Sequence, residues 1–297
     1  MKVLLTGSSG QLGKAIIKAK PKGINLIEAN RSLLDLNEPD LCQKYIKKIK
    51  PDLLINCAAY TNVDKAENNR KLAYLINSLS VKYLAESIKE INSKFIQLST
   101  DYVFDGAKNK PYLPEDLKSP INVYGETKSE AEDFIKEIFK DDQNGIIIRT
   151  SWLMGPTGKN FALKMLNLLS RNEKIDVIND QIGSPTTTFT LAKACWESIS
   201  FHLKGKLNHS IFHFANEGEA SWFEIAVEIE QITKDLGLLD KEILINPVAS
   251  SEYKLAAERP KYSVLDSKSS FESIALENQH WKNEMRNLFI EYKKTLT

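Results

Sequence analysis

The first half of the chain alternates short apolar runs with longer amphipathic stretches, and each apolar run ends in small or polar residues. This alternation is typical of repeated βαβ units that build a parallel sheet. Because the runs are nearly all apolar, they predict strands that are covered on both faces. The predicted strands are residues 2–6, 25–29, 53–57, 94–99 and 146–149.

Helices are expected between these strands. The clearest one has apolar residues at spacings of three and four, which predicts a single buried stripe. The stripe consists of Leu72, Leu75, Ile76, Leu79, Tyr83 and Leu84. A second helix is predicted from near Pro39 toward Lys48, with Asn37 as its N-terminal cap.

After about residue 150 the regular alternation fades, and Pro, Gly and Thr separate shorter segments. We therefore predict a large domain over residues 1–150 and a smaller lobe built mainly from residues 151–297. The boundary is soft, because the apolar run at residues 211–214 is a candidate for a strand that returns to the main sheet.

Composition excludes several classes of protein. The 297 residues are 42% hydrophobic, and 40 basic residues balance 39 acidic ones, so a globular protein with no nucleic-acid partner is expected. Three widely spaced cysteines indicate a reducing, cytoplasmic compartment. No apolar run approaches the roughly 18 residues of a spanning helix, so no membrane partner is expected.

The first predicted strand leads directly into TGSSGQLG at residues 6–13, a G-x-x-G-x-x-G pattern that opens a helix. Glycines in this position allow a tight turn and a close approach to a pyrophosphate, which the free N–H groups of the helix start then bind. The pattern predicts a Rossmann-type, doubly wound parallel α/β sheet that binds NAD(P). The expected contacts are Gly7, Gly10, Gln11, Leu12 and Gly13.

The end of the second predicted strand bears on the choice of cofactor. NAD-binding folds usually carry an acidic residue there, whereas this chain has Arg31, whose guanidinium suits the 2′-phosphate of NADPH. Glu28, two residues earlier than the usual position, keeps NADH open, and Arg31 as a plain surface residue is the alternative. Further cofactor contacts are expected from Asp35 and Leu36 and, after the third strand, from Ala58, Ala59 and Tyr60.

Tyr124 and Lys128 stand four residues apart, which places a phenol and an ammonium group on one helical face. A reductase must deliver a proton to the forming alkoxide, and a nearby ammonium is expected to lower the phenol pKa from its usual value near 10. Thr100, at the end of the fourth strand, adds a hydroxyl that can bond the substrate carbonyl. Thr100, Tyr124 and Lys128 are therefore the predicted catalytic set.

These motifs together resemble the dTDP-4-dehydrorhamnose reductases, a family of extended short-chain dehydrogenases/reductases. The segments STDYVFDG at 99–106 and NVYGETK at 122–128 carry the resemblance most strongly. It continues through nearly the whole chain, in the segments 51–56, 61–67, 150–152, 158–161, 180–186, 221–224 and 259–260.

The resemblance implies roles for individual residues. Tyr124 would be the proton donor, Lys128 would bind the nicotinamide ribose, and Thr100 with Asp101 would contact the sugar. Trp152 would line the sugar site, although burial between the lobes is an alternative explanation for this aromatic residue. The implied reaction transfers hydride from NAD(P)H to C4 of dTDP-4-dehydro-L-rhamnose, giving dTDP-L-rhamnose for cell-surface polysaccharide.

A metal site is not expected. Some family members bind magnesium through acidic residues at a dimer contact, but the position expected to help is Ala15, so magnesium dependence is uncertain and both a monomer and a homodimer stay open. The histidines lack metal-ligand spacing. They are His202, His209, His213 and His280.

Two other functions share parts of this pattern. A nucleotide-sugar epimerase or dehydratase would have the same fold and Tyr-Lys pair, but dehydrating relatives typically carry Asp-Glu after the threonine, whereas here Asp101 precedes Tyr102. The regulatory subunit of methionine adenosyltransferase is a related binding protein without this chemistry, and the intact catalytic set argues against it.

Overall fold

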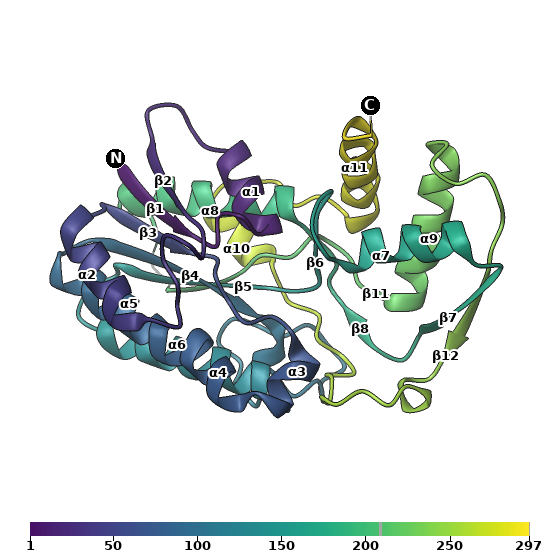
Figure 1. Ribbon diagram of the computed structural model, residues 1–297, viewed down its shortest axis with the longest axis horizontal. Coiled ribbons are helices and arrows are strands. Elements are labelled where there is room, and N and C mark those ends of the chain that lie inside the picture. The colour runs from purple at the N-terminus through teal and green to yellow at the C-terminus, as the bar shows by residue number, and fades with distance from the viewer. Residues whose placement is uncertain (208–209, 297) are drawn as a thin grey trace.

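Six parallel strands form the central sheet, in the order β10-β5-β4-β3-β1-β2 (Figure 1). The structure is a computed structural model and describes residues 1–207 and 210–296. The strands are β1 (Lys2–Thr6), β2 (Asn25–Ala29), β3 (Leu53–Asn56), β4 (Lys94–Thr100), β5 (Gly145–Thr150) and β10 (Ile211–His213). The first five agree with the predicted strands to within one residue at each end.

Helices cover both faces of this sheet, above and below it in Figure 1. One face packs on α1 (Gln11–Lys18), α8 (Thr188–Leu203) and α10 (Lys268–Ser273), and the other on α2 (Pro39–Ile49), α5 (Ser80–Glu90) and α6 (Val123–Ile138). Neighbouring residues of one strand therefore serve different cores, as Val3 and Leu5 face one and Leu4 faces the other. The predicted doubly wound arrangement is confirmed, since consecutive side chains of a strand point to opposite faces.

The C-terminal half contributes to both parts of the molecule. The predicted return of residues 211–214 to the main sheet is confirmed by β10, which pairs in parallel with β5. The smaller lobe, at the right of Figure 1, has its own apolar core. It is built from α7 (Phe161–Arg171), β7 (Lys174–Ile178), α9 (Trp222–Asp235), β12 (Leu244–Val248) and α11 (Trp281–Lys294).

Short elements join the two parts. Two two-stranded pairs lie at the junction, one of β6 (Leu153–Met154) with β9 (Thr186–Thr187) and one of β8 (Ile182–Gly183) with β11 (Ala220–Ser221). Further short elements are α3 (Val63–Asn68), α4 (Arg70–Tyr74) and the 3₁₀ turns η2 (Asp101–Val103) and η3 (Ser250–Glu252).

The predicted apolar stripe from Leu72 to Leu84 is only partly correct. The segment is helical throughout, but a π-helical turn, η1 (Leu75–Leu79), lies between α4 and α5. A π turn adds a residue, so the helix faces before and after it are no longer aligned as one stripe. Leu72, before the turn, is 39% exposed, and the polar Asn77, within it, is fully buried. Periodicity at 3.6 residues could not reveal this shift.

The predicted cap of α2 is wrong. The helix begins at Pro39 as expected, which makes Glu38 the capping residue, and its side chain accepts no capping hydrogen bond. Asn37 lies one position too early to cap, because the proline occupies the first helical position.

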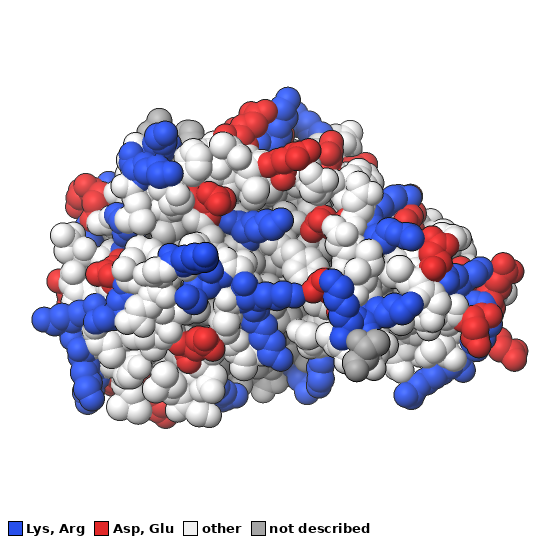
Figure 2. Space-filling view, turned by 90° about the horizontal axis from the view of Figure 1, so that it is seen from above, with Lys and Arg blue, Asp and Glu red and all other residues white. Residues whose placement is uncertain are grey.

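The surface carries both signs of charge. Figure 2 shows Lys and Arg interspersed with Asp and Glu over the face that it presents. This distribution agrees with the near-zero net charge of the sequence.

Candidate active site

The glycine loop joins β1 to α1 at the carboxyl edge of the sheet. Gly7 has a φ of +64°, and a Cβ at this position would stand 2.8 Å from the backbone nitrogen of Ala58. A Cβ at Gly13 would stand 2.3 Å from the carbonyl oxygen of Gly7. Both positions therefore require glycine, one for its left-handed backbone and both for close packing.

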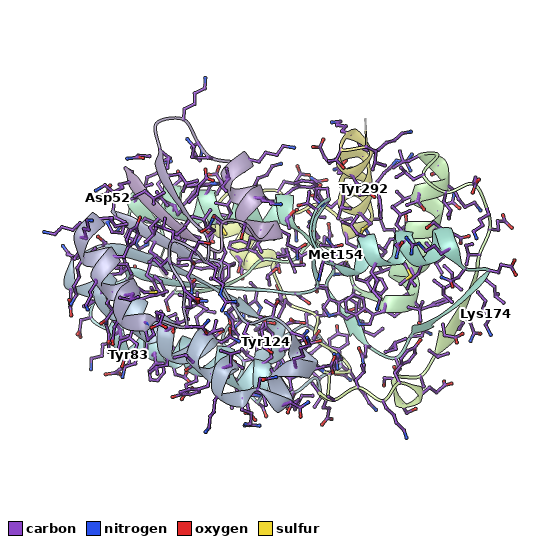
Figure 3. All side chains as sticks on the ribbon, in the orientation of Figure 1. Asp52, Tyr83, Tyr124, Met154, Lys174 and Tyr292 are labelled. Atoms are coloured by element: carbon purple, nitrogen blue, oxygen red, sulfur yellow. The ribbon has the colours of Figure 1, made fainter. Side chains whose placement is uncertain are left out.

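A cleft of about 700 Å³ begins at this loop and extends along the carboxyl ends of β3, β4 and β5. Tyr124 lines this cleft, and Figure 3 places Tyr124 near the middle of the molecule. Of the predicted site residues, the cleft is lined by Gly7, Gly10, Gln11, Leu12, Gly13, Arg31, Asp35, Leu36, Ala58, Ala59, Thr100, Asp101, Tyr124, Lys128 and Trp152.

The segment after β2 presents Arg31 to the cleft. Its side chain is 75% exposed, and its Nε donates to Asp35 Oδ2 at 3.1 Å. Glu28 lies within β2 and is exposed, whereas the lining residues of this segment are Arg31, Leu34, Asp35 and Leu36. An exposed guanidinium at the cleft edge suits a phosphate group.

The segment after β3 is fixed by the buried Asn77 of the π turn. Asn77 accepts a hydrogen bond from the Tyr60 backbone N–H at 2.7 Å and donates to the Tyr60 carbonyl at 3.0 Å. It also donates to the hydroxyl of Thr127, the neighbour of Lys128, at 3.2 Å. Tyr60 packs beside Tyr124 and Val123, while Ala58, Ala59 and Thr61 line the cleft. Asn77 thereby ties the cofactor side of the cleft to the helix that carries Tyr124.

Helix α6 positions Tyr124 and Lys128 one turn apart. Its cap is Asn122, whose side chain accepts from the Gly125 N–H at 2.8 Å. Lys128 is buried, and its Nζ donates to the carbonyl of Leu98 in β4 at 2.5 Å. The ammonium is therefore anchored to the strand whose end carries Thr100.

The pKa of Tyr124 moves in the opposite direction to the expectation. Burial raises it to about 12, and the neighbouring Thr100 hydroxyl opposes only part of that rise. Burial also lowers the pKa of Lys128 to about 8, against the opposing effect of Glu132. Loss of water around each group is the largest cause of its shift, so the phenol keeps its proton at neutral pH.

Asp101 is buried at the start of η2. Thr100 Oγ1 donates to Asp101 Oδ1 at 2.9 Å, and Ser151 Oγ donates to Oδ2 at 2.8 Å. Burial raises the pKa of Asp101 to about 6 despite these hydrogen bonds. The carboxyl group thus orients Thr100 and links the end of β4 to the residue that precedes Trp152.

The segment 153–160 is held against the glycine loop by hydrogen bonds of Gln11. Gln11 Nε2 donates to the Leu153 carbonyl at 3.1 Å, and Asn160 Nδ2 donates to Gln11 Oε1 at 3.2 Å.

The sequence did not predict every residue that lines the cleft, because the motifs pointed to neighbouring positions. The lining residues that were not predicted are Ser9, Leu34, Cys57, Thr61, Ile76, Leu98, Ser99, Thr150, Leu153, Gly158 and Lys159.

Within residues 1–207 and 210–296, no three His, Cys, Asp or Glu side chains converge as a set of metal ligands. None of the helices in the same part of the chain combines the length and apolar content needed to cross a bilayer. His209 lies outside the described residues.

Comparisons with known proteins agree with this geometry. Residues 1–294 match the family described as "RmlD substrate binding domain". A relative named dTDP-4-dehydrorhamnose reductase, from Aggregatibacter actinomycetemcomitans, is 33% identical over 97% of this chain and 98% of its own length.

Solved structures give the same result. A dTDP-4-dehydrorhamnose reductase from Clostridium acetobutylicum has a TM-score of 0.90 at 35% identity, covering 99% of this chain and 100% of that one. Its counterpart from Bacillus anthracis, solved in complex with NADP, has a TM-score of 0.88 at 34% identity, covering 98% and 99%. The chain therefore belongs to the dTDP-4-dehydrorhamnose reductase family and is an NAD(P)H-dependent oxidoreductase.

Proposed function

We propose that the chain uses NADPH to reduce the C4 ketone of dTDP-4-dehydro-L-rhamnose, giving dTDP-L-rhamnose. The observation that carries this proposal is a cleft that joins the glycine loop and Arg31 to Thr100, Tyr124 and Lys128. The names of the A. actinomycetemcomitans relative and of the two solved structures support the choice of sugar.

The cleft residues fit a dinucleotide. Glycine at positions 7 and 13 lets the loop pack tightly against Ala58 and against its own turn, and this loop opens α1, whose first N–H groups suit a pyrophosphate. Arg31 favours NADPH, because its fork of N–H donors matches a 2′-phosphate. The NADP complex of the B. anthracis relative supports this choice, and NADH remains the second cofactor to compare. The bound cofactor would supply the hydride for C4.

The residues of this chain would handle the proton. Tyr124, whose pKa is about 12, keeps its proton until negative charge develops on the C4 oxygen, and then donates it as a general acid. Thr100, whose hydroxyl donates to Asp101 Oδ1 in this structure, would turn that hydrogen toward the same oxygen when the sugar binds. Lys128, anchored on Leu98, would bind the nicotinamide ribose and keep positive charge near the phenol.

We assign the cofactor mainly to residues 1–150 and the sugar mainly to residues 151–297. Trp152 lines the cleft directly after β5, at the passage between the two parts of the chain. The three cysteines that could report on compartment, Cys42, Cys57 and Cys195, are free thiols, which supports a cytoplasmic location.

The rival functions lack a supporting observation. A dehydrating enzyme would need a second acid beside the catalytic threonine, where this chain carries Tyr102. A purely regulatory relative would not need Thr100, Tyr124 and Lys128 to meet in one cleft.

The test is loss of nicotinamide absorbance when purified protein receives NADPH or NADH with enzymatically prepared dTDP-4-dehydro-L-rhamnose. The proposal expects one cofactor to be oxidised for each sugar reduced, with NADPH preferred and dTDP-L-rhamnose identified by NMR. Oxidation without that product would contradict the assigned sugar. No oxidation by protein that binds NADPH would contradict the proposed reaction.

A further inference from the structure

Trp152 holds a strained backbone conformation. Its φ is +44°, in the left-handed region that bulky side chains rarely occupy. Such a residue persists only when its surroundings determine its position, and strained residues cluster at functional sites. Trp152 follows the last residues of β5 and lines the cleft. The contacts that hold this indole therefore bear on how the sugar is placed.

One of these contacts is a stack with Trp222. The two indole rings lie 3.6 Å apart between centroids, with an angle of 8° between their planes. Trp222 is the first residue of α9 in the small lobe, and its Nε1 donates to Gln181 Oε1 at 3.2 Å. Phe161 also packs against Trp222, with 4.6 Å between the two ring centroids. Gln181 and Phe161 therefore hold the Trp222 ring in place independently of Trp152.

The second contact is with Gly183. A Cβ built there would stand 2.5 Å from Trp152 Cε2, so only glycine leaves room for this indole. Gly183 belongs to β8, which pairs with β11, and β11 ends at Ser221 immediately before Trp222. The short β8–β11 pair at the junction therefore sets the positions of both partners of Trp152.

The start of α9 is itself firmly held. Ser221 and Glu224 form a capping box, in which the Ser221 side chain accepts from the Glu224 N–H at 3.1 Å and Glu224 accepts from the Ser221 N–H at 2.7 Å. This cap fixes the first turn of the helix and hence the Trp222 ring. The segment 221–224 carries part of the family resemblance, which assigned it no role. In the structure it supports the Trp222 ring.

We propose that Trp222 is a positioning residue that, together with Gly183, fixes the Trp152 indole as the sugar-facing wall of the cleft. This inference rests on the proposed function, since it names how the same site orients its nucleotide-sugar substrate. An indole face suits the apolar C–H face of a 6-deoxyhexose, and a preformed wall spares the substrate the ordering of a loose side chain.

The proposal makes a prediction about steady-state kinetics. Trp222→Ala frees the Trp152 ring, so the KM for the nucleotide sugar rises about 2- to 10-fold, the range expected for loss of one aromatic pair. The Kd for NADPH stays within about 2-fold, because Trp222 lies outside the cofactor side of the cleft. Trp222→Phe, which keeps a ring against Trp152, restores most of the affinity for the sugar.

Two controls separate positioning from general support of the small lobe. Trp281→Phe changes another buried tryptophan of that lobe's core, and it should lower thermal stability without raising the KM for the sugar. The near-ultraviolet circular dichroism of the stacked indoles should be lost in Trp222→Phe and kept in Trp281→Phe. A double-mutant cycle is the sharper test, because Trp222→Ala should have no further effect on the KM in a Trp152→Ala background.

The outcomes distinguish this inference from the proposed function. Wild-type protein without turnover of the 4-keto sugar contradicts the proposed function, and the positioning role is then judged by binding of dTDP-L-rhamnose to the same variants. An unchanged KM or Kd for the sugar in folded Trp222→Ala overturns the positioning role. Additive effects of the two substitutions also overturn it, because they would show that Trp222 does not act through Trp152.

Discussion

Arg149 donates two hydrogen bonds to Glu132 in the interior of the large domain, from Nε to Oε1 at 2.9 Å and from Nη2 to Oε2 at 2.7 Å. Both side chains are fully buried, with exposed fractions of 1% and 0%. Ser99 Oγ also donates to Glu132, at 2.6 Å. This pair therefore joins the ends of β4 and β5 to α6, one turn beyond Lys128, and helps to hold the catalytic set together.

Replacing Glu132 with Gln should affect both stability and pH dependence. The unpaired Arg149 charge would lower the free energy of unfolding by about 3–5 kcal/mol, measured by urea titration. Glu132 opposes the fall in the pKa of Lys128, so its loss should lower that pKa below about 8. The alkaline limb of kcat/KM then moves to lower pH. An unshifted limb in folded protein would show that Glu132 does not influence Lys128.

Tyr124→Phe removes the hydroxyl group that carries the transferable proton and leaves the ring in place. We expect turnover to fall by about 10²- to 10⁴-fold, the usual contribution of general acid catalysis, while NADPH binding measured by fluorescence titration is retained. Tyr83→Phe, on α5, serves as the matched control, because Figure 3 shows Tyr83 well away from Tyr124. Near-normal turnover in Tyr124→Phe would exclude the phenol as the proton donor.

Arg31 should decide between the two cofactors. Arg31→Ala removes a charged partner of the 2′-phosphate, which is worth about 1.5–3 kcal/mol and corresponds to roughly 10- to 100-fold in the KM for NADPH. The KM for NADH should change little, because NADH lacks that phosphate. Equal losses with both cofactors would indicate that Arg31 acts elsewhere in the cleft.

His213 should make the protein sensitive to acid. Its Nε2 lies 3.2 Å from Arg149 Nη1 and its Nδ1 lies 3.1 Å from the Tyr112 carbonyl, so burial, aided by the Arg149 charge, lowers its pKa to about 3. The unfolded chain, with a His pKa near 6.5, binds more protons between these values, and stability falls as pH drops from about 6.5 toward 3.

The measurement is the free energy of unfolding against pH for wild type and His213→Gln. The wild type should lose up to about 5 kcal/mol more than the variant across this window. Asp101 contributes in the opposite direction, because its pKa is raised to about 6 and its share of stability falls as pH rises through that value. The difference between the two proteins isolates His213, and identical slopes would contradict its neutral state.

The sequence by itself determined the elements and the chemical groups. Local periodicity was enough to locate β1 to β5, because a strand buried on both faces must be apolar along its length. The glycine loop was also readable, since the steric need for glycine at positions 7 and 13 arises within one βα turn and its neighbouring strand.

Only the tertiary structure decided the environment of those groups. The burial of Asn77 depends on a π turn, the raised pKa of Tyr124 depends on the water that its neighbours exclude, and the position of the Trp152 ring depends on Trp222 and Gly183. The last two are set by residues distant in the chain, which a local pattern cannot encode, and the π turn shifts the period on which such a pattern rests. Burial and electrostatic free energy depend on these non-local contacts, whereas hydrophobic periodicity reports only which face of a segment avoids water.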